Sequence, residues 1–162
     1  MRGSPEINSV RISLATRRDA VRIARMSRVL IEVGLEWTWT PERVLRQIED
    51  NDTSVIVCRH YDRIVGFAVM RFLEEASHLL LLAVEPSYQR GSLGRRMLEW
   101  LERSAQTAGI FRVYLEVRAG NRRAQDFYRA LSYDTIAISH GYYGGREAAV
   151  RMARDMRVKS PS

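Results

Sequence analysis

The stretch that decides the fold reads Val84-Glu85-Pro86-Ser87-Tyr88-Gln89-Arg90-Gly91-Ser92-Leu93-Gly94-Arg95. An apolar strand ends here, a proline interrupts it, and a turn of small residues opens a helix. The start of a helix leaves about four backbone N–H groups without partners and carries roughly half a positive charge. Small residues let an anion approach these donors, so the stretch predicts a phosphate-binding loop. A plain helix start with surface arginines explains the same residues equally well.

Two common phosphate loops are excluded by the spacing of this stretch. No Gly-Lys-Ser/Thr follows the glycines, as a Walker loop requires, and Gly91 and Gly94 do not form the dinucleotide pattern Gly-x-Gly-x-x-Gly. The loop therefore predicts an anion site of another kind.

The elements on either side of the loop alternate between the period of a strand and that of a helix. Strands are expected at 11–14, 54–59, 64–72, 78–85, 111–117, 134–139 and 148–153, with helices starting near 16, 40, 93 and 121. The order is β-α-α-β-β-β-α-β-α-β-β. Such an order is typical of a mixed α/β domain around one central sheet.

The length and composition of the chain fit one globular domain. The 162 residues are 46% hydrophobic and 28% charged, which predicts a single domain over 1–162 with its core at about 10–156 and loose ends. No run approaches the ~18 apolar residues that span a membrane. The single cysteine, Cys58, lies in an apolar strand and is expected to be a buried thiol. A cytoplasmic enzyme without a membrane partner is therefore expected.

The formal net charge is +7. A positive field suits phosphates, nucleic acid or an acidic surface. A nucleic-acid-binding module would show a recognised motif or a repeated basic-aromatic pattern, and the sequence has neither. We therefore expect no nucleic-acid partner.

Two further residues are candidates for proton transfer. Glu116 lies in an apolar strand, where an acid is costly unless it has a partner or a function, and a carboxylate with a raised pKa is a candidate general base. Tyr128 follows on the next helix, and its phenol can protonate a leaving thiolate. Simpler interpretations remain open, since Glu116 could face solvent and pair with an arginine, and Tyr128 could be a core residue.

Three aromatic residues are candidates for binding a second substrate. Trp37 precedes the second helix, and Tyr142 and Tyr143 lie in a glycine-flanked loop. Each could equally pack the segment that carries it. His60, His78 and His140 have no metal-ligand spacing and no Cys or acid cluster, so no metal is expected.

Taken together, these motifs resemble the GNAT superfamily of N-acetyltransferases, most closely the ribosomal-protein alanine N-acetyltransferase (RimI) group. The strand, loop and helix from Ala83 to Arg95 match its coenzyme-binding pattern. The run Leu115-Glu116-Val117-Arg118-Ala119-Gly120-Asn121 resembles its Leu-Glu-Val-Arg-Ala-x-Asn motif, and later elements resemble 142–147. The resemblance covers roughly residues 10–156.

The resemblance implies a central mixed, mostly antiparallel sheet flanked by helices and split between the fourth and fifth strands, with acetyl-CoA in the split. It implies that Glu116 accepts a proton, that Tyr128 donates one, and that the tyrosine loop seats a peptide N-terminus. The coenzyme contacts that it implies are Leu82, Ala83, Val84, Gln89, Arg90, Gly91, Ser92, Leu93, Gly94, Arg95 and Asn121.

The expected activity is direct acetyl transfer from acetyl-CoA to a primary amine, a protein or peptide N-terminal α-amine in the first interpretation. A small amine, amino acid or antibiotic is the alternative acceptor, and the sequence leaves monomer and homodimer open. One departure concerns the coenzyme loop, where Ser92 replaces the usual first glycine. If Ser92 has a positive φ, a change to glycine is expected to tighten coenzyme binding.

Overall fold

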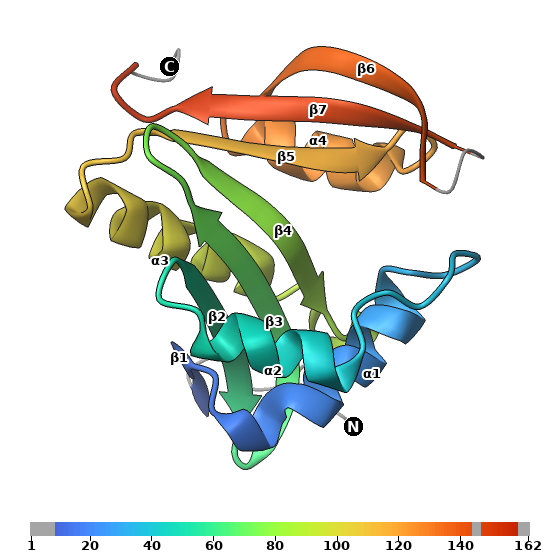
Figure 1. Cartoon of the computed structure of the whole chain (residues 1–162), viewed down its shortest axis with the longest axis vertical. Helices are drawn as coiled ribbons and strands as arrows, with labels where there is room; N and C mark the ends of the chain where they lie inside the picture. The colour runs from blue at the N-terminus through green and yellow to red at the C-terminus, as the bar shows by residue number, and fades with distance from the viewer. Residues whose placement is uncertain (1–8, 144–146, 159–162) are drawn as a thin grey trace. The chain divides into compact units, whose positions relative to one another are not determined.

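The computed structural model describes residues 9–143 and 147–158 (Figure 1). The strands are β1 (Val10–Leu14), β2 (Thr53–His60), β3 (Arg63–Phe72), β4 (Ser77–Val84), β5 (Arg112–Arg118), β6 (Asp134–Tyr143) and β7 (Glu147–Asp155). The helices are α1 (Ala20–Leu30), α2 (Pro41–Glu49), α3 (Leu93–Thr107) and α4 (Arg122–Ala130), with short 3-10 turns η2 (Arg17–Asp19) and η3 (Pro86–Tyr88). The predicted order of strands and helices is confirmed, and the two 3-10 turns are additions to it.

The strands form one sheet in the order β1-β2-β3-β4-β5-β7-β6. β1 runs antiparallel to β2, β7 runs antiparallel to both β5 and β6, and β4 runs parallel to β5. The register of β4 and β5 contains three residue pairs and ends at Leu79 opposite Leu115. The remaining residues of the two strands, 80–84 and 116–118, continue outside that register. The mixed, mostly antiparallel sheet with a split between its fourth and fifth strands is thus confirmed.

The chain forms two compact units. The first comprises the described residues up to Met70 together with Leu81–Leu101, and the second comprises Arg71–Leu80 and the chain from Glu102 onward. β4 and α3 each contribute residues to both units. The single-domain organisation over 1–162 stays a prediction.

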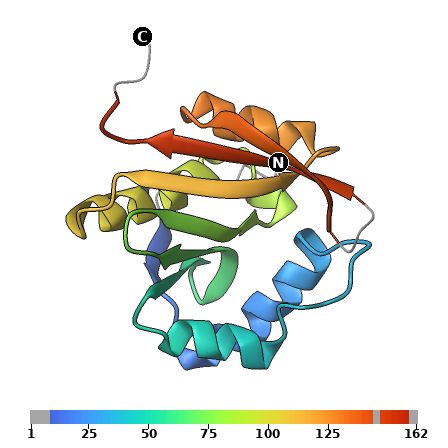
Figure 2. The same ribbon diagram turned by 45° about the horizontal axis from the view of Figure 1, so that its top comes forward.

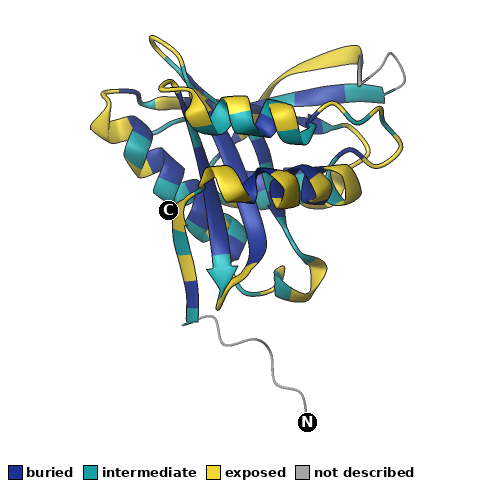
Figure 3. Cartoon of the chain, turned by 60° about the horizontal axis from the view of Figure 1, so that its bottom comes forward, coloured by how far each residue is buried: buried dark blue, intermediate teal, exposed yellow. Residues whose placement is uncertain are grey.

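The core of the first unit contains two largely buried strands, β2 and β3. Every residue from Ile64 to Met70 of β3 is buried, as are four consecutive residues of β2, and Figure 3 shows these strands in dark blue. Cys58 of β2 is fully buried as expected, and burial raises its pKa to about 12. The thiol is therefore a core group and not a nucleophile.

The segment between α1 and α2 is organised by a buried carboxylate, that of Glu32. Its Oε1 accepts hydrogen bonds from the Thr38 backbone N–H at 2.7 Å and hydroxyl at 2.7 Å, and from the Trp39 N–H at 3.3 Å. Its Oε2 accepts from the Ser27 hydroxyl at 3.0 Å. One acidic side chain thereby fixes the loop that carries Trp37 and Trp39.

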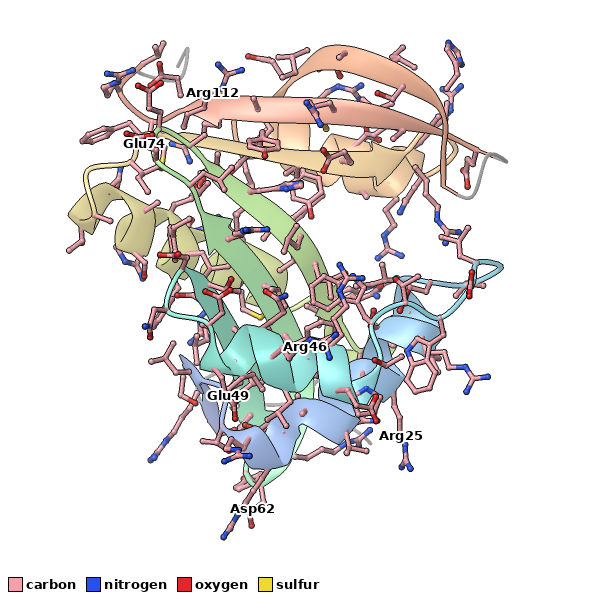
Figure 4. The ribbon with its side chains drawn as sticks, in the orientation of Figure 1. Arg25, Arg46, Glu49, Asp62, Glu74 and Arg112 are labelled. Carbon is pink, nitrogen blue, oxygen red and sulfur yellow. The ribbon has the colours of Figure 1, made fainter. Side chains whose placement is uncertain are left out.

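The second unit contains β5, β6 and β7, with α4 lying against them (Figures 1 and 2). β5 alternates, with Val113, Leu115 and Val117 buried and the residues between them half-buried. The β3–β4 turn lies beside the start of this strand, where Figure 4 labels Glu74 and Arg112, and the Ser77 hydroxyl donates to the Arg112 carbonyl at 3.2 Å. The alternation gives β5 one apolar face and one polar face.

A buried polar cluster holds the end of α3 in the second unit. Glu102 of α3 accepts hydrogen bonds from the Tyr133 hydroxyl at 2.8 Å and from Arg154 Nη1 at 2.9 Å. Tyr133 is fully buried, and burial together with the Glu102 carboxylate raises its pKa. The phenol therefore stays neutral and donates to Glu102.

Candidate active site

The strand that ends at the predicted phosphate loop is held in place from two sides. Glu85, directly after β4, accepts hydrogen bonds from Arg63 at 2.7 and 3.0 Å and another from Arg22. Its backbone N–H donates to the Val65 carbonyl at 2.8 Å. Glu85 was not singled out from the sequence, because its two partners come from α1 and β3. It fixes the direction in which the chain leaves the strand.

The predicted coenzyme residues of β4 form its last three positions. Ala83 is buried while Leu82 and Val84 are half-buried, as their alternation requires. Gly66 of β3 lies so close that a Cβ at its position would come within 3.1 Å of the Ala83 carbonyl. The backbone of β4 is thus closely packed on this side.

The loop is held in shape by hydrogen bonds of its own backbone and of one side chain. The Gln89 amide donates to the Val84 carbonyl at 3.0 Å, and the Gly91 N–H donates to the Tyr88 carbonyl at 3.2 Å. Gln89, predicted as a coenzyme contact, therefore also closes the turn between the strand and the helix.

The helix α3 begins directly after a residue in the left-handed region. Ser92 has φ +60°, so the residue in that conformation is the serine and not one of the neighbouring glycines. The first helical hydrogen bond runs from the Arg96 N–H to the Ser92 carbonyl at 3.0 Å. The N–H groups of Leu93, Gly94 and Arg95 precede that bond and are not used within the helix. This is the donor arrangement that the sequence predicts for an anion.

The three arginines near the loop differ in their surroundings. Arg90 is exposed. Arg95 forms a surface ion pair with Glu99 at 3.1 Å, whereas Arg96 is half-buried and donates to the Val10 carbonyl at 3.5 Å. Arg90 and Arg95 can therefore reach an anion in solvent, and Arg96 supports the packing of β1.

The acidic candidate Glu116 lies in the second unit, on the polar face of β5. His78 Nε2 of β4 is 2.5 Å from its Oε2, and Arg151 of β7 donates to its Oε1 from Nη2 at 2.9 Å and Nε at 3.2 Å. Only 7% of the Glu116 side chain is exposed. The expected arginine partner is therefore present, together with a histidine, but the side chain does not face solvent as that interpretation supposed.

The pKa of Glu116 differs from the raised value that the sequence suggested. Burial acts to raise it, but the hydrogen bonds and charges of His78 and Arg151 outweigh burial, and the pKa is lowered. The expectation of a raised pKa is therefore wrong, because it considered the apolar strand and not the partners on neighbouring strands. Glu116 is an ionised carboxylate at neutral pH.

Asn121 lies at the start of α4, and Tyr128 lies on the inner side of this helix. The Asn121 side-chain oxygen accepts the Ala124 N–H at 3.1 Å, so Asn121 is the N-cap of α4 and its amide N–H groups lie outside the cap. Tyr128 is buried and packs edge-on against Tyr133, with ring centroids 5.8 Å apart. The burial agrees with the core interpretation and is also compatible with a proton donor.

The aromatic candidates for acceptor binding have different outcomes. The Trp37 indole N–H donates to the Ala24 carbonyl at 3.2 Å, and the Arg28 guanidinium lies 5.0 Å from its ring centroid. The backbone of Tyr142 and Tyr143 belongs to the end of β6. Their side chains lie outside the described residues, as does 144–146. Their role in binding an acceptor stays a prediction.

Within 9–143 and 147–158, no group of three or more His, Cys, Asp or Glu side chains could hold a metal ion. Over the same ranges, no helix is long and apolar enough to cross a membrane.

Comparison with known proteins identifies the family. The sequence model of the Acetyltransferase (GNAT) family matches residues 23–133. The chain belongs to the GNAT family. An N-alpha-acetyltransferase RimI of Mycobacterium tuberculosis is 31% identical over 151 residues, which is 90% of this chain and 92% of that protein.

Two further similarities support the assignment. A [Ribosomal protein bS18]-alanine N-acetyltransferase of Salmonella typhimurium is 37% identical over 95 residues, a match that spans 57% of this chain and 64% of that relative. The fold is shared with the PaiA N-acetyltransferase of Thermoplasma acidophilum, whose crystal structure is a complex with coenzyme A. That structure has a TM-score of 0.75 and 18% identity, and the match covers 91% of this chain and 99% of that one.

Proposed function

We propose that this GNAT protein transfers the acetyl group of acetyl-CoA to the N-terminal α-amine of a protein or peptide. The observation that carries the proposal is the start of α3, where three backbone N–H groups follow a left-handed Ser92. Such a helix start binds phosphate through its donors and its dipole. Family membership supplies the thioester chemistry, since acetyl-CoA is the acetyl donor that an acetyltransferase requires.

The residues of the chain divide the work of the reaction. The N–H groups of Leu93, Gly94 and Arg95 would bind the pyrophosphate, with Arg90 adding charge from solvent. The backbone of 82–84 would hold the pantetheine arm and polarise the thioester carbonyl, and Asn121 would donate its amide N–H groups to the coenzyme. When bound, acetyl-CoA supplies an activated acyl group for direct attack by an amine.

The two proton transfers are assigned to residues of the second unit. Glu116 would accept the proton of the incoming amine through a water molecule, and Tyr128 would protonate the departing thiolate. An α-amine has a reference pKa of about 7.7–8.0, against about 10.4 for lysine, so it needs a smaller push to become neutral. This difference supports an α-amine acceptor. A small amine, amino acid or antibiotic remains the alternative.

The experiment is a product assay with purified protein and acetyl-CoA. An alanine-initiated peptide, the same peptide with a blocked N-terminus and an internal lysine, and a panel of small amines are each tested for coenzyme A release and analysed by mass spectrometry. We expect acetylation of the free α-amine and not of the blocked peptide. Turnover of small amines together with no peptide product would contradict the proposed acceptor. A cytoplasmic location and a lack of nucleic-acid partners stay predictions, and the choice between monomer and homodimer stays open.

The left-handed Ser92 gives a direct test of the coenzyme loop. A non-glycine residue at this φ costs about 1–2 kcal/mol, so Ser92→Gly should tighten acetyl-CoA binding by about fivefold if the loop adopts this conformation fully only with coenzyme bound. Isothermal titration calorimetry measures the dissociation constant. Ser92→Ala is the matched control, because it removes the hydroxyl and keeps the Cβ. An unchanged dissociation constant for the glycine variant would mean that the loop tolerates serine without strain.

A further inference from the structure

The imidazole of His78 is held in one orientation by two neighbouring side chains. Its ring is stacked on Tyr114, with centroids 4.3 Å apart and planes inclined by 16°, and its Nε2 is 2.5 Å from Glu116 Oε2. In the β4–β5 register His78 lies opposite Tyr114, and Glu116 lies two residues further along β5. Stacking and hydrogen bonding together fix both the plane and the direction of the ring.

The two oxygens of Glu116 have separate partners. Arg151, which lies opposite Glu116 in the β5–β7 register, donates twice to Oε1, and Oε2 faces His78. An ionised carboxylate only accepts hydrogen bonds, so Nε2 of His78 carries a hydrogen. In a neutral imidazole the other nitrogen, Nδ1, then has the free lone pair. The carboxylate thereby selects the tautomer of the ring.

Glu116 is a poor final acceptor for a proton in this arrangement. Protonation of its carboxylate would give up the charge-assisted bonds from Arg151, and imidazole is intrinsically a stronger base than a carboxylate. His78 is also more accessible, with 18% of its side chain exposed against 7% for Glu116. A carboxylate that orients a histidine, which in turn takes the proton, is a recurrent arrangement for activating a nucleophile.

We propose that His78, oriented by Glu116, receives the proton that the acceptor amine releases before it attacks the thioester. The inference rests on the proposed acetyltransferase function and moves the destination of the proton from Glu116 to its partner. The ammonium N–H bond breaks, the electron pair stays on the amine nitrogen, and the proton passes through water to Nδ1. The Nε2–H stays bonded to Glu116, and the imidazolium later returns its proton to solvent.

The charged and titratable groups around His78 within this unit come from three strands. Tyr114 and Glu116 belong to β5, and Arg151 belongs to β7. On β3, the hairpin bond from the Leu73 N–H to the Ala76 carbonyl at 2.8 Å brings Arg71 next to the position of His78. The groups near His78 are therefore one carboxylate, two guanidinium groups and one phenol.

The test is the pH dependence of kcat for His78→Gln at saturating substrates. The glutamine amide can still donate to Glu116, but it cannot take a proton. We expect kcat to fall by about 10²-fold at pH 7. The loss should shrink to about threefold at pH 9.5, because an α-amine with a reference pKa of about 7.7–8.0 is then already neutral. His60→Gln, which changes a histidine in the first unit, should keep the wild-type profile.

Each outcome of this experiment either supports or contradicts the role of His78. A loss of kcat that is equal at all pH values, or no loss at all, would overturn the role of His78. If His78→Gln keeps full activity while Glu116→Gln is inactive, Glu116 itself is the acceptor of the amine proton. If His78→Gln and Glu116→Gln both keep full activity, the residue assignments of the proposed function fail as well. Thermal unfolding checks the fold of each variant. If the glutamine variant unfolds, His78→Ala takes its place, and recovery of rate on adding imidazole supports the proposal, whereas no recovery in a folded variant overturns it.

Discussion

Replacement of Glu116 by glutamine is expected to lower kcat by about 10²- to 10⁴-fold at pH 7, the range typical of a lost general base. The amide keeps the shape of the side chain and can still accept a hydrogen bond from Arg151, but it neither takes a proton nor orients a histidine as a carboxylate does. Binding of acetyl-CoA should stay within about threefold of wild type, because the donors assigned to the pyrophosphate lie at the start of α3. Steady-state kinetics and calorimetry measure the two quantities separately.

The matched control for this variant is Asp126→Asn. Asp126 is an exposed carboxylate of α4, in the same unit, and it pairs with Arg129 on the helix surface at 3.3 Å. The same chemical change should leave kcat unchanged there, since an exposed ion pair contributes little. A Glu116→Gln variant that is folded and as active as Asp126→Asn would show that proton transfer does not use Glu116.

The sequence predicted the elements well because each has a strong period of its own. The strand of alternating burial at β5 and the capped start of α4 at Asn121 are local features, and a local feature can be read from neighbouring residues. Ser92 is a similar case. Its place in a loop that usually has glycine raised the question of a positive φ, and the structure has φ +60°.

The surroundings of Glu116 could not be predicted in the same way. His78 is 38 residues away and Arg151 is 35, and both meet the carboxylate only through the registers of β4 and β7 with β5. A single-residue shift of either register would turn the partner to the opposite face. The sequence therefore indicated an unusual acid but gave the wrong direction for its pKa. Glu85 was missed for the same reason, since its partners Arg22 and Arg63 lie on α1 and β3.

Removal of the Glu102 carboxylate should strongly destabilise the fold outside the candidate site. Glu102 is the shared acceptor of Tyr133 and Arg154, and 7% of its side chain is exposed. Glu102→Ala would leave a buried phenol and a largely buried guanidinium without their acceptor, which costs about 3–5 kcal/mol. For a chain of this length that corresponds to a fall in Tm of about 10 °C. Thermal and urea unfolding measure both quantities.

Two comparisons separate the buried cluster from a general effect of losing a glutamate on α3. Glu99→Ala removes a carboxylate three residues earlier, where 43% of the side chain is exposed, and should cost less than about 1 kcal/mol. Tyr133→Phe removes only the hydroxyl that donates to Glu102, so the double variant should be less destabilised than the sum of the single variants. The difference reports the coupling through the 2.8 Å hydrogen bond. Equal losses for Glu99→Ala and Glu102→Ala, or strict additivity with Tyr133→Phe, would mean that solvent replaces these contacts and that the cluster does not stabilise the end of α3.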